Sequence, residues 1–372
     1  MEGLVINYWF IFIGKNLVKT ILQQLKIMTP KEQGFFFPAE WHPHVATWLT
    51  FPHNNHSWQD DKLAKMYLQY FQFIKAISKG ENVCLNVDNE QLKGFILKQL
   101  PIYNIDENQI EILINPTNDA WCRDHGPAFL INPETQKRMI VNWSYNAWGG
   151  KYPPFDDDDN LPIKIAKYRG LEYVTPNIIM EGGSVDFNGK GAVLTSRSCL
   201  LNPNRNPHLN QAQIEEYLCD YYGLEQVLWV KDGIVGDDTD GHIDDTARFI
   251  NEDTVVAAVE YNKNDENYEV LNENLRLMKQ MRLLNGKQLN VIELPMPSPV
   301  IIDDFRTPGS YANFLICNAG VIVPTYQCKN DDIALDILTQ AFKGREIIGL
   351  EATNIIWGQG SFHCLSQQEP MV

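Results

Sequence analysis

Four short segments of the sequence bring together side chains that can act as nucleophile, acid, base or charge clamp. They are WCRDHGP at 121–127, MEGGS at 180–184, GDDTDGHIDD at 236–245 and WGQGSFHCLSQQ at 357–368. Each lies where a predicted strand meets a loop, and catalytic groups are commonly held on such loops. These segments are therefore the candidates for a catalytic site.

Each segment also has an ordinary structural interpretation. Asp124, just before Gly126-Pro127, could cap a turn, and the two glycines after Glu181 allow a tight one. A cysteine such as Cys364, following a glycine-rich turn, is usually a core residue. The acidic run around His242 could bind a metal, but calcium loops have a different spacing and one histidine is few for zinc. No segment alone identifies the chemistry.

Taken together, the segments supply the side chains that attack on a guanidinium group requires: Cys364, His242, Glu181, Asp124 and Asp244. Carboxylates can hold the planar, cationic fork of N–H donors, and a thiolate can attack its central carbon. A histidine can pass protons to the leaving ammonia and take them from the incoming water. Such a reaction needs neither a metal nor an organic cofactor, so we expect none.

The composition is that of a well-buried globular protein with an acidic excess. The chain has 372 residues, of which 44% are hydrophobic, and a net charge of −16. This charge disfavours nucleic acid and anionic lipid surfaces and favours small cations, although it also serves solubility. We expect a small cationic substrate and no nucleic-acid or membrane partner, and we leave a homo-oligomer open.

The seven cysteines are scattered and form no CxxC pair, which predicts reduced thiols in a cytoplasmic protein. The apolar stretch Leu4–Ile13 is too short to span a membrane, and it has neither a basic leader nor a cleavage site. Met28 offers a second start. We expect residues 1–27 to be a non-native or optional extension, with a short peripheral helix as the alternative.

The rest of the chain alternates β-rich runs with amphipathic helical stretches. We expect helices at 61–77, 90–100, 211–222, 268–284 and 331–342, and strands at 46–51, 83–87, 110–114, 128–131, 139–142, 192–195, 227–230, 246–250, 254–258, 290–293, 314–317, 320–324 and 346–350. Repeated strand, strand, helix, strand units without a linker predict one α/β domain at 28–372. The acidic run 156–159 is interpreted as a solvated loop, with attraction of a cationic substrate as the alternative.

The motifs resemble those of agmatine deiminases and bacterial peptidylarginine-deiminase-type proteins, within the guanidino-group-modifying (pentein) superfamily. Seven segments carry the resemblance, in the family's order: FPAEWHPHVATWLTFPHN at 37–54, WCRDHGP at 121–127, NAWGGKYPP at 146–154, EGG at 181–183, LLNPNRNPHL at 200–209, GHIDD at 241–245 and GQGSFHCLSQQEP at 358–370. They span nearly everything after the N-terminal extension.

The resemblance implies hydrolysis of agmatine to N-carbamoylputrescine and ammonia, which feeds putrescine synthesis. It also implies a five-bladed α/β propeller with the site at its central axis. Cys364 would be the nucleophile that forms a thiouronium adduct, and His242 the general acid and base. Glu181 would orient that histidine, while Asp124 and Asp244 would clasp the guanidinium.

Two further positions follow from the resemblance. Trp121 would line the channel along the alkyl stem of the substrate. Gln359 stands where the family's turn has a glycine. If that position has a positive φ, glutamine is strained there by about 1 kcal/mol. The change could also alter the size of the pocket.

Rival interpretations share parts of this pattern. A deiminase of peptidyl-arginine or free arginine would use the same chemistry, although the α-carboxylate of arginine would need a basic partner such as Arg123 or Arg205. A catalytically silent guanidinium-binding protein would bind agmatine without releasing ammonia. A cysteine protease would leave the paired aspartates unexplained, and a metallohydrolase would lose its activity to a chelator.

Overall fold

Five sheets, one of four strands and four of three strands, form the frame of the protein, in a computed structural model that describes residues 28–59 and 61–372. The sheets are β18-β1-β2-β3, β4-β5-β6, β7-β8-β9, β10-β11-β12 and β15-β16-β17, and a hairpin β13-β14 stands apart. Their strands are β1 (His44–Thr50), β2 (Asn82–Val87), β3 (Ile110–Ile114), β4 (Ala128–Asn132), β5 (Lys137–Val141), β6 (Glu172–Val174), β7 (Val185–Phe187), β8 (Ala192–Ser196), β9 (Gln226–Val230), β10 (Ala247–Asn251), β11 (Thr254–Val259), β12 (Asn290–Pro295), β13 (Ile301–Ile302), β14 (Phe305–Arg306), β15 (Leu315–Cys317), β16 (Gly320–Thr325), β17 (Ile347–Glu351) and β18 (Ser366–Pro370).

Each of the five sheets joins an antiparallel pair to a parallel strand. In one of them, β4 is antiparallel to β5 and β5 is parallel to β6. Parallel neighbours need a crossover connection, which is usually a helix. The crossovers here carry α2 (Lys62–Ile77), α3 (Glu90–Gln99), α7 (Leu161–Arg169), α9 (Gln211–Tyr222), α10 (Tyr268–Met278) and α11 (Asn330–Ala341). The element order thus repeats as strand, strand, helix, strand, and the expected α/β class is confirmed.

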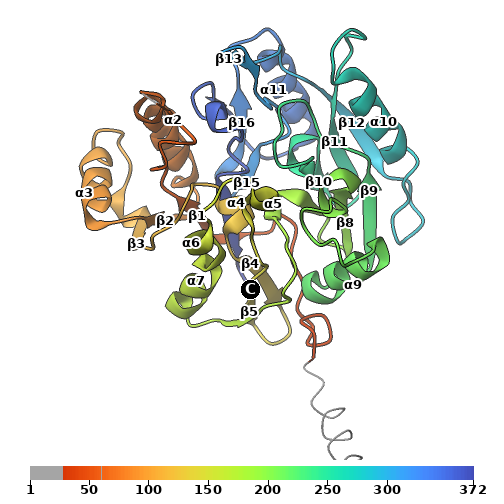
Figure 1. Ribbon diagram of the computed structural model, residues 1–372, viewed down its shortest axis with the longest axis horizontal. Helices are drawn as coiled ribbons and strands as arrows, with labels where there is room; N and C mark the ends of the chain where they lie inside the picture. Colours follow the sequence, from red (N-terminus) through yellow and green to blue (C-terminus); the bar gives the residue numbers. More distant parts are fainter. Residues whose placement is uncertain (1–27, 60) are drawn as a thin grey trace, which may run out of the picture.

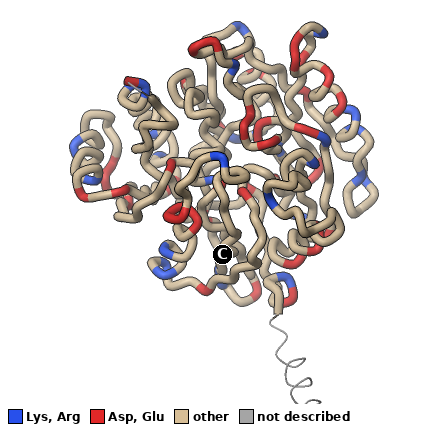
Figure 2. The backbone as a smooth tube through the Cα atoms, viewed as in Figure 1, with Lys and Arg blue, Asp and Glu red and all other residues tan. Residues whose placement is uncertain are grey.

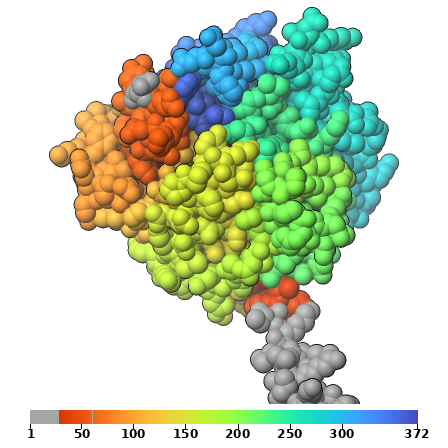
Figure 3. All heavy atoms as spheres, in the orientation of Figure 1, coloured from red at the N-terminus to blue at the C-terminus, as the bar shows by residue number. Residues whose placement is uncertain are grey.

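The C-terminal strand completes the first sheet. β18 runs antiparallel to β1, with Ala46 opposite Glu369 and Leu49 opposite Ser366. The longer helices lie toward the outside and the sheets toward the middle (Figure 1). In the space-filling view, segments follow one another around the face in sequence order, so the blue C-terminal part borders the orange N-terminal part (Figure 3). The loop that carries Cys364 enters β18 directly, so this closure helps to fix the candidate nucleophile.

The hydrophobic core explains why these elements hold their places. All six residues of β11 (TVVAAV) are buried, as expected for a strand covered on both faces. The side chains of Tyr70, Phe71 and Phe73 on helix α2 are buried in the core. The ring of Phe73 stacks on that of Phe362, with centroids 4.6 Å apart. The core therefore also anchors the segment just before Cys364.

Several expected elements differ from the observed ones. Helix α10 ends at Met278 rather than at 284. The chain turns back there through Gly286, whose φ is +77°, and Leu283 N donates to Lys287 O at 2.9 Å. The structure also adds α7, β6, β7 and β18, which the sequence patterns did not indicate.

The acidic run 156–159 was wrongly predicted to be a solvated loop. It forms the short helix α6 (Asp156–Asp159), and Asp158 is only 2% exposed. The Asp158 carboxylate accepts the main-chain N–H of Asn118 at 2.7 Å. That bond holds Asp158 in the interior, because its carboxylate satisfies the main-chain N–H of Asn118 there.

Two expectations concern regions outside this frame. Residues 1–27, expected to be an extension, lie outside the described residues. Across residues 28–59 and 61–372, no helix combines the length and the apolar character needed to cross a membrane.

Candidate active site

The five predicted catalytic residues converge from equivalent places in four sheets, each on the segment that enters the first strand. Asp124 lies on α4 (Cys122–His125) before β4, and Glu181 precedes η2 (Gly182–Ser184) and β7. His242 and Asp244 flank the start of η3 (Ile243–Asp245) before β10, and Cys364 precedes β18. All five are buried. The fifth sheet contributes Asn313, which the sequence patterns did not indicate, just before β15.

Asn313 and Asp244 hold the Cys364 side chain. Asn313 Nδ2 donates to Cys364 Sγ at 3.0 Å, and Cys364 Sγ lies 3.5 Å from Asp244 Oδ2. Burial raises the pKa of the Cys364 thiol well above its ordinary value, and Asp244, Asp245 and Asp124 add to this effect. In the free protein the group therefore rests as a thiol.

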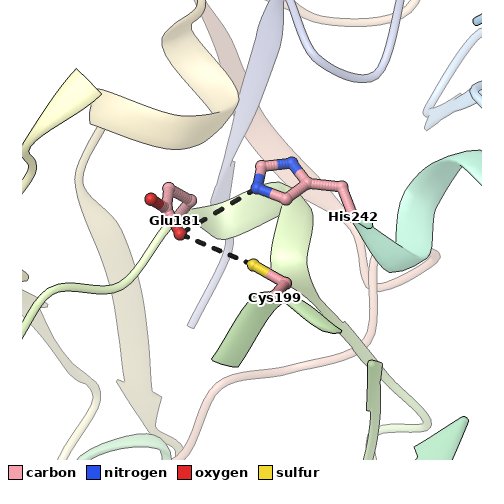
Figure 4. Close-up of side chains that lie close together, drawn as sticks. All are labelled: Glu181, Cys199 and His242. Atoms are coloured by element: carbon pink, nitrogen blue, oxygen red, sulfur yellow. Dashed lines mark hydrogen bonds and ion pairs between the residues drawn. The ribbon is translucent and has the colours of Figure 1, made fainter. Parts of the chain in front are cut away.

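His242 lies between two carboxylates. Its Nδ1 is 3.7 Å from Asp124 Oδ1. Its Nε2 is 3.9 Å from Glu181 Oε2, a contact drawn in Figure 4. Burial by itself would lower the pKa of His242, but Asp124 and Glu181 raise it well above the ordinary value. The ring therefore rests as an imidazolium that can donate a proton.

Arg205 fixes Glu181 from behind. Arg205 Nε donates to Glu181 Oε1 at 2.6 Å, while the guanidinium also bonds Asp240 Oδ2 at 2.6 Å and Thr239 O at 2.8 Å. Burial would raise the pKa of Glu181, but Arg205 and His242 outweigh it and lower the pKa. Glu181 therefore stays ionised beside the imidazole.

Asp124 and Asp244 differ in what their oxygens contact. Asp124 accepts the indole N–H of Trp148 and the main-chain N–H of Gly183, both at 2.9 Å. Asp244 Oδ2 lies 2.7 Å from His363 Nδ1, whereas the buried Oδ1 has no partner among the described residues. Burial raises the pKa of Asp124 despite the opposing charge of His242. The pKa of Asp244 is lowered, because its bond to His363 outweighs burial.

Gly183 shows how tightly these groups converge. A Cβ at this position would lie 2.5 Å from His242 Nδ1, 2.9 Å from Asp124 Oδ1 and 3.1 Å from Asp244 Oδ2. Real Cβ contacts below 3.0 Å essentially never occur, so even an alanine would displace the histidine. The EGG motif therefore keeps the space between the three side chains open.

A cavity of about 800 Å³ reaches two of the five catalytic residues, Asp124 and Cys364, and the other three lie behind its wall. Cys364, Asp124, Trp121 and Trp148 line its inner part, and Trp121 stacks on Trp58 with ring centroids 5.3 Å apart. The wall further contains three acidic side chains, Asp119, Asp158 and Asp238. No arginine among the described residues lines it. The acidic lining is thus suited to a cation.

The two arginines named as partners for an arginine carboxylate point elsewhere. Arg205 is held by Glu181, as described above. Arg123 donates from Nη1 to Gln368 Oε1 at 2.7 Å and from Nε to His363 O at 3.3 Å. Lys151 does line the cavity, but its ammonium lies 2.9 Å from Asp240 Oδ1. These cations are already paired with protein groups.

Two groups of three ligand-type side chains lie close enough together to share an ion, within the part of the chain that the structure describes. They are Glu181–Cys199–His242, drawn in Figure 4, and Asp244–Asp245–Cys364. In the first, Arg205 already neutralises Glu181. In the second, Asn313 Nδ2 bonds Asp245 at 2.9 Å and His363 bonds Asp244. Arg205 repels a cation at the first group, and at the second group one oxygen of each aspartate is already bonded to a protein group, so both are poor metal sites.

Gln359 has the strained backbone expected for a glycine position. It ends η4 (Ile356–Gly358) with φ 73° and ψ 22°, in the left-handed region. Its side chain lines the cavity. Gly360, one residue on, allows Trp121 to approach, because a Cβ there would lie 2.5 Å from the indole. The turn before Cys364 thus shapes the cavity directly.

Sequence reasoning missed several residues that contact the predicted set, among them Asn313, Trp148 and His363. Trp148 and His363 belong to segments that carried the family resemblance, but no role was assigned to them. Asn313 lies in no such segment. The only available signal was its position just before a strand, matching the other four catalytic segments.

Comparison with known proteins assigns the family. The family model for the Porphyromonas-type peptidyl-arginine deiminases matches residues 36–370. An agmatine deiminase of Ectopseudomonas mendocina (strain ymp) is 33% identical over 366 residues, covering 92% of this chain and 97% of the relative.

Solved structures agree with this assignment. The agmatine deiminase of Enterococcus faecalis has a TM-score of 0.87 and 33% identity, covering 93% of this chain and 99% of its own. A cysteine-to-serine variant of C. jejuni agmatine deiminase with substrate bound has a TM-score of 0.81 and 33% identity, covering 90% and 96%. The α/β fold is therefore similar to that of these enzymes, and the chain belongs to the Porphyromonas-type peptidyl-arginine deiminase family.

Proposed function

We propose that this protein hydrolyses agmatine to N-carbamoylputrescine and ammonium, and so supplies a precursor of putrescine. The observation that carries the proposal is a buried thiol beside two carboxylates at the inner end of an acidic cavity. Relatives of one-third identity that are named agmatine deiminase support the same reaction.

The substrate guanidinium would lie between Asp124 and Asp244. The unpartnered Asp244 Oδ1 offers an acceptor for one N–H of the fork, and charge-assisted bonds of this kind are strong in a buried site. Trp121 and Trp148 would flank the methylene stem. The distal ammonium would face the acidic wall formed by Asp119, Asp158 and Asp238.

Binding of the cation would also activate the nucleophile. Besides burial, three carboxylates raise the pKa of Cys364, and two of them, Asp244 and Asp124, are the ones that the guanidinium would neutralise. An opposite charge within a few ångströms favours the ionised form of a thiol. The thiol proton then passes to solvent, and the thiolate is formed only when substrate is present.

The first half-reaction would break a C–N bond. The thiolate attacks the central guanidinium carbon to give a tetrahedral adduct. The His242 imidazolium donates its proton to one amino group, which leaves as ammonia, and a cationic S-amidino (thiouronium) enzyme remains. Glu181, held ionised by Arg205, stabilises the imidazolium beforehand.

The second half-reaction would restore the enzyme. Neutral His242 removes a proton from water as the oxygen attacks the thiouronium carbon. The adduct collapses with the C–S bond electrons returning to sulfur, and the remaining hydroxyl proton ends on ammonia as ammonium. The Cys364 thiolate takes its proton back from solvent when the products leave. The product carries a ureido group and no charge at that end, so it loses the attraction of Asp124 and Asp244.

At the level of architecture we propose a five-bladed propeller in one catalytic domain at 28–372, located in the cytoplasm. Five sheets of the same topology, each with a side chain at the site, support this arrangement. All the proposed catalytic side chains come from one chain. A homo-oligomer is therefore compatible with the proposal but not required by it.

The deciding experiment compares agmatine, free arginine and a peptidyl-arginine at equal concentration. Ammonia release and mass identification of the ureido product are measured, with Cys364→Ala as the blank. Turnover confined to agmatine supports the proposal. Turnover of the peptide alone would keep the mechanism but change the substrate, and binding of agmatine without ammonia would mean a silent binding protein.

A further inference from the structure

His363, the residue just before the nucleophile, is bound on both sides by carboxylates. Its Nδ1 lies 2.7 Å from Asp244 Oδ2 and its Nε2 lies 2.8 Å from Glu40 Oε2. The residue is 1% exposed. No hydrogen bond joins its ring to the Cys364 thiol among the described residues, so the two neighbours do not form a cysteine–histidine pair.

The two bonds specify the protonation of the ring. An ionised carboxylate only accepts hydrogen bonds, and a neutral imidazole has a single N–H. Two bonds to two ionised carboxylates therefore require a proton on each ring nitrogen. A ring in this state is a cation, and it has no lone pair with which to act as a base.

The surroundings keep both carboxylates ionised. Glu40 bonds Arg248 Nη2 through Oε2 and accepts the main-chain N–H of Ile316 at 2.6 Å through Oε1. Burial would raise the pKa of Glu40, but Arg248 and His363 hold it far below its usual range. Despite burial, the pKa of Asp244 is lowered mainly by His363 itself, and the charges of His242 and Arg248 act in the same direction.

Other charged groups near the His363 ring come from α4 and β10. Arg123 of α4 approaches Glu40 to 4.0 Å and donates to the main-chain oxygen of His363. Arg248 of β10 also bonds Asp186 of β7 at 2.5 Å. Two arginines thus face the Glu40 end of the ring. The Asp244 end faces Cys364 and the substrate space.

We propose that His363 is a positioning residue, a fixed imidazolium that ties Asp244 by one oxygen and leaves the other for the substrate guanidinium. Oδ2 is occupied by the ring and the thiol, while Oδ1 is buried and unpartnered. Asp244 would otherwise be free to rotate or to take up a proton beside Asp245. This inference rests on the proposed guanidinium-binding role of Asp244.

The first test removes the charge and keeps a donor. In His363→Asn the amide N–H can still reach Asp244, but the side chain is neutral. We expect kcat/KM for agmatine to fall at least tenfold, mainly through KM. The pH below which KM rises should move upward by about one unit, because the Asp244 carboxylate loses its cation. A KM profile identical to that of the parent enzyme would overturn the proposal.

Two further variants separate this role from simple packing. Glu40→Gln leaves every substrate-contacting residue intact but removes the second ionised acceptor, so its KM profile should move in the same direction. His44→Asn is the matched control, because His44 is another buried histidine that bonds a carboxylate, Glu81, at 3.0 Å. It should lower thermal stability without moving the profile. If the KM profile shifted equally in Glu40→Gln and in His44→Asn, the shift would reflect a general loss of packing.

A third measurement does not depend on turnover. Nitrogen-15 NMR of histidine-labelled protein, assigned with His363→Asn, should show both His363 ring nitrogens protonated in the folded protein. A neutral tautomer there would overturn the proposal. If the parent protein released no ammonia from agmatine while His363 was doubly protonated, the proposed function would fail and the charge state would stand.

Discussion

Cys364 depends on its substrate for reactivity, because carboxylates surround the resting thiol. We expect Cys364→Ala to reduce ammonia release by at least about 10³-fold, since no other thiol lies in the cavity wall and covalent catalysis is lost. Agmatine should still bind within about tenfold of the parent affinity, because Asp124 and Asp244 remain.

Isothermal titration with agmatine measures that binding. Cys219→Ala is the control, since Cys219 is a half-buried free cysteine outside the cavity wall. It should leave both turnover and binding unchanged. Residual turnover in Cys364→Ala would remove the nucleophile assignment.

The acidic wall of the cavity makes agmatine binding pH-dependent. Burial raises the pKa of Asp119 to about 6 and that of Asp158 to about 7. The ionised forms attract the distal ammonium, so KM for agmatine should rise as the pH falls from 8 to 6. In Asp158→Asn, KM should be high already at pH 8 and vary less with pH. An Asp158→Asn profile that matches the parent would contradict a role in binding.

The raised pKa of Asp158 also makes the free energy of unfolding depend on pH, in the direction opposite to that of a carboxyl group whose pKa is lowered by folding. Below its ordinary pKa of 3.8 Asp158 is protonated in both states, and between 3.8 and about 7 only the folded state keeps the proton. Its contribution to stability is therefore largest in acid and is lost as the pH rises through that interval.

Residue types in sequence were sufficient to predict the reacting groups but not their supports. Cys364, His242 and Asp124 lie in motifs whose glycines and prolines mark functional loops. The partners of His363 are Glu40 and Asp244, which are far away in sequence. No local pattern indicates such a pairing, and it follows only from how the two ends of the first sheet, before β1 and before β18, meet the segment before β10.

At the scale of elements, the turn before β18 carries a backbone strain that can be removed. Gln359→Gly should raise the free energy of unfolding by about 0.5 kcal/mol, because relief of the left-handed strain of about 1 kcal/mol is partly offset by a more flexible unfolded chain. Loss of the side chain from the cavity wall should raise KM for agmatine about two- to fivefold, equivalent to at most about 1 kcal/mol.

Gln327→Gly provides the matched control, since Gln327 also has a positive φ, of 54°, and lies outside the cavity. Urea unfolding and agmatine kinetics are measured for both variants. Both should gain stability, and only Gln359→Gly should change KM. A loss of stability in Gln359→Gly alone would mean that its side chain contributes contacts that outweigh the strain.

Regular elements with clear periodicity were predictable, and those stabilised by polar contacts were not. β3 and α9 fall where the apolar spacing placed them. β18 reads SQQEP, which looks like a surface loop, yet all five residues are buried. Gln368 of this strand bonds Arg123 of α4 and Glu369 bonds Trp48 of β1, and no local sequence pattern indicates such distant partners.

Over the whole molecule, the charge distribution and the closure of the first sheet act together. The chain carries a net charge of −16, and acidic residues occur near the middle of the face shown in Figure 2. Such a field favours the approach of a small cation. The site itself is assembled only when β18 pairs with β1, because Cys364 lies two residues before that strand.

Glu369 is the side chain that most directly couples this closure to global stability. It is fully buried and accepts Trp48 Nε1 at 2.8 Å, Arg169 Nε at 3.1 Å and Arg138 Nη1. Glu369→Gln should lower the free energy of unfolding by about 3 kcal/mol, since two arginines lose their buried counter-charge. Glu293→Gln, which affects an exposed pair with Lys279, should cost less than about 1 kcal/mol. Urea unfolding followed by circular dichroism and by residual activity should give one shared midpoint in Glu369→Gln, because the site and the first sheet are lost together. Activity lost at clearly lower urea than the fold would show that β18 detaches on its own, with the rest of the protein still folded.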